Sequence, residues 1–90
     1  MPRYLVKRTF PGGLAFRAND AGAELLQRVC DTNAEFGVDW LHSYVTEDKE
    51  TSYCVYDGPD PEAIRRAAEA NVLLVDSITP ISVLDPHFYR

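Results

Sequence analysis

A histidine, a cysteine and several tyrosines lie close together in the middle of the chain, within two short runs of strand-forming residues. His42 is in the first run, between Trp40 and Tyr44, and Cys54 is in the second, near Tyr56. Neutral imidazole, thiolate and oxygen groups are ligands that first-row transition metals accept, so this region could bind a metal. The same residues could instead be structural, with the histidine hydrogen-bonded in a core or interface, the cysteine buried and the tyrosines in cross-strand pairs.

A predicted β-hairpin positions these side chains. Residues 38–46 and 51–57 are rich in β-branched and aromatic residues, and a charged turn separates them. Strict alternation places Trp40, His42 and Tyr44 on one face of the first strand. The opposite face is also largely apolar, so neither face is plainly turned to water. The hairpin therefore predicts a pocket, a subunit interface, or both.

The flanking sequence predicts two helices and two more strands. The strands are expected at residues 4–10 and 78–84, and the helices at residues 19–35 and 61–71. An asparagine or an aspartate can cap the first helix, and an aspartate followed by a proline begins the second. The order β-α-β-β-α-β, with two interleaved right-handed crossovers, predicts a single ferredoxin-like α+β domain over residues 1–90. Both helices then cover one sheet face, so we expect a homodimer, a dimeric α+β barrel, that buries the sheet faces carrying Trp40 and Tyr44.

The apolar spacing predicts which side of each helix is buried. In the first helix, rows with i, i+4 spacing predict a buried face that includes Leu26 and Cys30. The second helix is predicted to turn Ile64, Ala67 and Ala68 inward. Both helices are thus amphipathic, as expected for elements that cover a sheet.

Composition narrows the classes of function. The 14 acidic residues against 9 basic ones give a formal net charge of −5, which argues against a nucleic-acid surface. No apolar run approaches the ~20 residues that span a bilayer, and no signal peptide is recognised, so a cytoplasmic protein without a membrane partner is expected. Cys30 and Cys54 are too few for a disulfide framework and are expected to be reduced. No phosphate loop or nucleophilic-triad motif is found.

Six segments spread over nearly the whole chain carry a family resemblance. They are Tyr4-Leu5-Val6-x-Arg8, Phe10-Pro11-Gly12, Trp40-Leu41-His42-Ser43-Tyr44-Val45, Tyr53-Cys54-Val55-Tyr56, Pro61-Glu62-Ala63-Ile64-Arg65 and Leu84-Asp85-Pro86. In this order they resemble a small bacterial family catalogued as a domain of unknown function, DUF4242, which contains a nickel-binding ferredoxin-like protein. The resemblance implies a dimeric ferredoxin-like domain that can bind a divalent metal, with no established reaction.

With this resemblance, the leading hypothesis is a cytoplasmic protein that binds a divalent metal, nickel (Ni²⁺) first of all. His42 is expected to control binding, with Cys54 and Glu62 as further ligands and Tyr44 as an alternative ligand in the hairpin. The residues expected to line a ligand pocket are Trp40, Tyr44 and Tyr56.

Two positions depart from the family pattern. Many relatives have glutamate where this chain has Lys7, and a histidine in the second helix where it has Ala67. If either position supplies a ligand, metal binding is expected to be weaker here. The alternative hypothesis is a dimeric α+β barrel enzyme or sensor that encloses a small hydrophobic ligand, with isomerase or oxygenase chemistry as the fold-level analogy. A binding protein is favoured over an enzyme.

Overall fold

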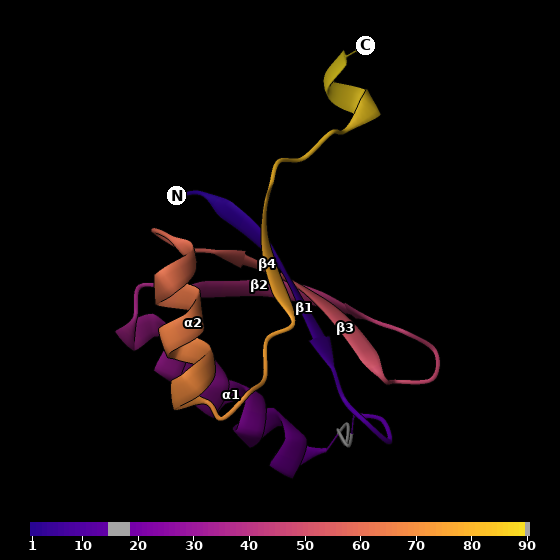
Figure 1. Cartoon of the computed structure of the whole chain (residues 1–90), viewed down its shortest axis with the longest axis vertical. Coiled ribbons are helices and arrows are strands. Elements are labelled where there is room, and N and C mark those ends of the chain that lie inside the picture. Colours follow the sequence, from indigo (N-terminus) through magenta and orange to yellow (C-terminus); the bar gives the residue numbers. More distant parts are fainter. Residues whose placement is uncertain (15–18, 90) are drawn as a thin grey trace.

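The computed structural model describes residues 1–14 and 19–89, which form four strands, two α-helices and a short 3-10 helix (Figure 1). The elements are β1 (Arg3–Thr9), α1 (Asp20–Glu35), β2 (Asp39–Val45), β3 (Thr51–Asp57), α2 (Pro61–Ala70), β4 (Ser77–Ile81) and η1 (Pro86–Tyr89). The strands form one antiparallel sheet in the order β2-β3-β1-β4, with both helices against the same face. This topology confirms the predicted ferredoxin-like α+β fold. Within the described part of the chain, no helix has the length and apolar character needed to cross a membrane.

Each helix begins where the sequence predicts a cap. The Asn19 side-chain oxygen accepts a hydrogen bond from the Gly22 amide at 3.0 Å. The Asp60 carboxylate accepts one from the Ala63 amide at 2.8 Å, and Pro61 occupies the first turn of α2. These contacts satisfy amides that have no partner within the helix.

Both helices end in the same hydrogen-bond pattern, but with different residues at its left-handed position. After α1, Gly37 has φ = 70°, and the amides of Gly37 and Val38 bond back to the last turn at 3.1 and 3.0 Å. After α2, Val72 has φ = 57°, and the amides of Val72 and Leu73 bond back at 3.0 and 2.9 Å. Glycine adopts this conformation freely, whereas a β-branched residue is strained there.

Replacing Val72 by glycine is therefore expected to stabilise the protein by about 0.5–1 kcal/mol. The left-handed conformation costs an L-residue about 1–2 kcal/mol, and the greater freedom of glycine in the unfolded chain offsets part of that gain. The Val72 side chain is 90% exposed, so little packing is lost. Urea unfolding of the wild type and Val72→Gly measures the difference, with Val72→Ala as the control that keeps the left-handed cost. A glycine variant no more stable than the alanine variant would contradict the expectation.

β4 is shorter than predicted, because its partner strand ends. Arg3 is the first residue of β1, and it pairs with Ile81, the last residue of β4. Beyond Ile81 no residue of β1 remains to pair with, so the predicted extension to Leu84 does not form. The chain instead leaves the sheet and continues to η1, away from the rest of the domain (Figure 1).

A β-bulge in β2 separates residues that strict alternation would place together. Trp40 pairs with Tyr56, but His42 pairs with Val55, so two steps along β2 correspond to one step along β3. Trp40 therefore lies on the helix-covered face with Tyr56, whereas His42 and Tyr44 lie on the open face. The prediction that Trp40, His42 and Tyr44 share one face is wrong.

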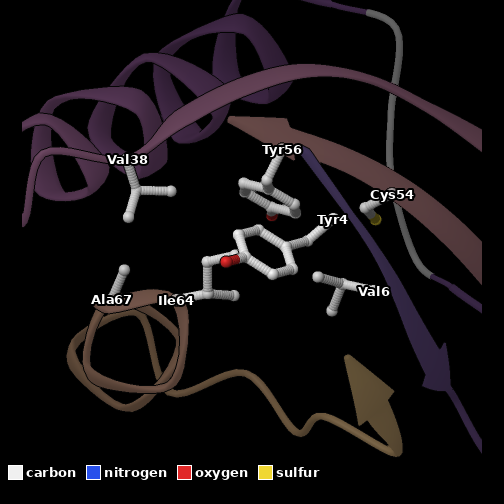
Figure 2. Close-up of a cluster of buried hydrophobic side chains, with 7 residues drawn as sticks. All are labelled: Tyr4, Val6, Val38, Cys54, Tyr56, Ile64 and Ala67. Atoms are coloured by element: carbon white, nitrogen blue, oxygen red, sulfur yellow. The ribbon is translucent and has the colours of Figure 1, made fainter. Parts of the chain in front are cut away.

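The core lies between the helix-covered face of the sheet and α2. Figure 2 shows its side chains converging from β1 and β3, from Val38 just before β2, and from α2. The cluster consists of Tyr4, Val6, Val38, Cys54, Tyr56, Ile64 and Ala67. The prediction that α2 turns Ile64, Ala67 and Ala68 inward is confirmed.

α1 buries fewer apolar side chains than α2 does. Its buried residues are Gly22 and Asn33, while Leu26 and Val29 are half-buried. Cys30 is exposed, so its predicted place on the buried face is wrong. The row that faces the sheet advances by four, three and four residues because the helix has 3.6 residues per turn, and a straight i, i+4 row drifts away from it.

Candidate functional site

His42 lies on the sheet face that the helices leave open. Its imidazole is exposed and makes an edge-to-face contact with Tyr44, with ring centroids 5.3 Å apart and ring planes at 86°. The strand register places Val55 and then Leu5 in the same row across the sheet. The imidazole is thus open to an ion from solvent, beside a phenol and above an apolar strip of the sheet.

The other two predicted ligands lie on the opposite side of the sheet from His42. Cys54 is buried on the helix-covered face, with its Sγ 3.6 Å from Ser52 Oγ. Glu62 is exposed at the start of α2, where its carboxylate lies 3.5 Å from Arg66 Nε. Because α2 covers that same face, His42, Cys54 and Glu62 do not form one site within a chain.

The open face also carries carboxylates, and one of them is already paired. Asp39 and Asp57 are directly opposite each other in the register of β2 and β3. Arg3 donates to Asp57 from Nε at 2.8 Å and from a terminal nitrogen at 3.2 Å, and these hydrogen bonds hold the pKa of Asp57 below its ordinary value. Among the described residues, no three histidine, cysteine, aspartate or glutamate side chains gather closely enough to hold an ion. The described residues of one chain therefore do not supply a full donor set for nickel.

The two departures from the family pattern lie on opposite sides of the sheet. Lys7 is exposed on the open face and pairs with Tyr53, which in turn pairs with Tyr44. Ala67 lies on the side of α2 that faces the core and is 2% exposed. A ligand at position 7 would share the face of His42, whereas a ligand at position 67 would not. Of the two departures, Lys7 is therefore the one that lies on the same face as His42.

A cavity of about 370 Å³ lies between α1 and the helix-covered face of the sheet. Trp40 and Tyr56 line it, and Tyr44 does not, because the bulge places Tyr44 on the open face. The side chains that α1 contributes to its wall are Leu25, Leu26 and Val29. These three side chains are exposed or half-buried, so α1 does not fill this space.

One residue of the cavity was missed by sequence reasoning. Arg8 lies in its wall and is 3% exposed. The signal for it is the alternation in β1, since Arg8 has the same inward parity as Tyr4 and Val6. One terminal nitrogen of Arg8 donates to the Tyr56 hydroxyl at 3.3 Å, and the guanidinium carbon lies 5.6 Å from the centre of that ring.

Comparison with known proteins identifies a family. Residues 4–81 match the family described as "Nickel responsive protein SCO4226-like". The fold is similar to the crystal structure of SCO4226 from Streptomyces coelicolor A3(2), with a TM-score of 0.73 and 17% identity, over 92% of this chain and 99% of that chain. A comparison with curated proteins gave no match. The family match supports the nickel-related part of the predicted resemblance and does not favour the isomerase or oxygenase alternative.

Proposed function

The chain belongs to the SCO4226-like family of nickel responsive proteins, and we propose that it binds nickel(II) at the open face of its sheet through His42. The observation that carries the proposal is the exposed His42 imidazole beside Tyr44 on a face that no helix covers. Imidazole nitrogen is a ligand that suits nickel, and solvent can reach it here. No reaction is assigned to this site.

A second copy of the chain completes the site in this proposal. One imidazole does not hold nickel by itself, and a homodimer through the open faces would bring a second set of nitrogen and oxygen groups to the same place. The exposure of Tyr44 (65%) and Tyr53 (36%) on that face supports such an interface. Trp40 takes no part in it, because it lies on the helix-covered face. A stable interface of this kind buries more than about 1,000 Å² in total.

Calorimetric titration of nickel(II) into protein purified without a histidine tag tests the proposal, with light scattering to count the chains in the complex. We expect binding by a dimer. The absence of nickel binding by the wild type would overturn the proposal, and binding by a monomer would overturn its second step.

A Lys7→Glu variant is expected to bind nickel at least about fivefold more tightly at low ionic strength. Positions 7 and 42 lie on the same face, on the two strands that flank β3, and are offset by two residues along the strands. Strand spacing and rise place them about 12 Å apart. Exchanging a positive for a negative charge at that distance from a divalent cation is worth about 1 kcal/mol in water with little salt. Direct ligation by the new carboxylate would add to this.

The matched control is Lys7→Gln, which removes the positive charge without adding a carboxylate. We expect it to give about half the gain in binding free energy if the effect acts through space, and added salt should then abolish both gains. A gain for Lys7→Glu that persists in salt indicates ligation. A glutamate variant that binds no better than the wild type at low salt would contradict the prediction.

A further inference from the structure

The cavity beneath α1 combines an apolar wall with a buried positive charge. Its wall is mainly apolar, and none of the described residues that line it carries a carboxylate. Arg8 is 3% exposed, and no ion pair to it is found among the residues that the structure describes. Among the described residues, Arg8 is therefore a buried cation without an ionic partner, in a chain with a net charge of −5.

The guanidinium of Arg8 is only partly satisfied. One terminal nitrogen donates to the Tyr56 hydroxyl, but the Nε–H has no hydrogen-bond acceptor within the described part of the chain. A buried charge without a counter-charge is costly, and a guanidinium keeps its charge in proteins. The face of the Tyr56 ring offsets part of that cost through a cation–π contact. The guanidinium has five N–H groups and the hydrogen bonds among the described residues use one of them, so an anion in the cavity would meet unused donors.

Tyr56 offers a second donor to the same anion. Because its oxygen already accepts a hydrogen bond from Arg8, its own proton is free to be donated elsewhere. Burial raises the pKa of Tyr56 above its ordinary value, although the charge of Arg8 acts in the opposite direction. The phenol therefore keeps its proton at neutral pH and remains a donor.

The chemistry of the wall selects the class of anion. A phosphate ester would bring close to two negative charges to a single guanidinium and would leave one without a partner. A carboxylate brings one charge and two oxygens, and guanidinium geometry matches it well. Leu25, Leu26 and Val29 can cover an apolar body, and the side chains of Ser43, Ser52 and Asn71 in the wall already make contacts within the protein. The volume of about 370 Å³ is in the range of small-molecule pockets.

We propose that this cavity binds a small amphipathic monocarboxylate, with its carboxylate on Arg8 and Tyr56 and its apolar body against α1. The site is separate from His42, which lies on the other face of the sheet. It is a binding site, and no reaction is assigned to it. The proposal does not depend on nickel binding.

Trp40 gives a direct readout for this site, because it is the single tryptophan of the chain and it lines the cavity. Titration with hexanoate, octanoate and decanoate at pH 7 and constant salt is followed by tryptophan fluorescence and by calorimetry. We expect affinity to rise about tenfold for each added pair of methylenes until the cavity is full. Decanol, which has the same apolar body without the charge, is expected to bind at least about tenfold more weakly than decanoate.

Two methionine variants separate the buried charge from general electrostatics. Arg8→Met should weaken decanoate binding at least about tenfold and leave decanol binding within about twofold. Lys7→Met removes the same charge from the neighbouring position on the opposite face and should change neither. His42→Ala should also change neither, which separates this site from the nickel site.

The comparison of decanoate with decanol in the wild type decides the matter even if Arg8→Met fails to fold. Equal affinity for the acid and the alcohol, or no binding of decanoate by the wild type, would overturn the proposal. Where Arg8→Met folds, equal decanoate affinity in the variant and the wild type would overturn it as well.

Discussion

His42→Ala is expected to weaken nickel(II) binding at least about a hundredfold. Replacing even a group that merely orients a ligand typically costs about 10–100-fold in metal affinity, so removing the ligand itself costs at least that much. His42 is the histidine that lies in the sheet, exposed on its open face, and the remaining oxygen groups on that face bind nickel less strongly than imidazole does. Calorimetric titration of tag-free wild type and His42→Ala measures the difference.

The chain supplies its own matched control, because it has two histidines. His87 is exposed in η1, away from the sheet (Figure 1), and His87→Ala is expected to bind nickel as the wild type does. Acidification should weaken binding in the wild type and in His87→Ala, because protonated imidazole is not a ligand. A loss in His87→Ala equal to that in His42→Ala would show that the tail histidine also contributes to the site. Unchanged affinity in His42→Ala would remove His42 from it.

Local signals were enough to place the elements of this fold. The aspartate and proline at the start of α2 and the asparagine before α1 cap the helices as the sequence indicates. Gly37 ends α1 at the expected left-handed position. The end of β4 was not readable in this way, because it depends on where a strand far away in sequence begins. Arg3 of β1 decides that Ile81 is the last paired residue.

The candidate site was harder to predict, because the strand register decides which face a side chain occupies. A single extra residue in β2 moves His42 to the opposite face from the one that it would share with Trp40. Nothing in the alternation of residues 38–46 marks that bulge. Once it is known, the group predicted as one site divides into two. His42 and Tyr44 belong to the open face, and Trp40 and Tyr56 belong to the cavity.

Arg8 shows the opposite case, because the alternation along β1 predicts that its side chain is buried. In β1 the buried side chains of Tyr4 and Val6 alternate with half-buried or exposed ones, and Arg8 continues the buried series. A cation at an inward position of a central strand needs a counter-charge or a ligand, since its burial is otherwise costly. The same alternation that predicts the strand therefore also predicts a charged cavity beneath it.

Ile64→Ala is expected to lower the free energy of unfolding by about 2–5 kcal/mol. The sheet that carries both His42 and Arg8 packs against α2 through this side chain. Ile64 is 1% exposed and fills the space between α2 and the strands. A methyl group built on Gly58 would make ordinary van der Waals contacts, 3.5 Å from Ile64 Cγ1 and 3.6 Å from Val38 Cγ2, so Gly58 borders the space that Ile64 occupies. The surroundings cannot collapse fully into the cavity that alanine leaves, which adds to the lost burial.

Urea unfolding at a fixed protein concentration measures this cost, with Leu74→Ala as the matched control. Both substitutions remove three carbon atoms, but Leu74 is 76% exposed and its truncation should change stability by no more than about 0.5 kcal/mol. Ile64→Val, which removes a single methylene, should fall between them at about 0.5–1.5 kcal/mol. Total stabilities of small domains are about 5–15 kcal/mol, so Ile64→Ala can remove a large share of the whole. Equal losses for Ile64→Ala and Leu74→Ala would show that α2 is not packed on the sheet through Ile64.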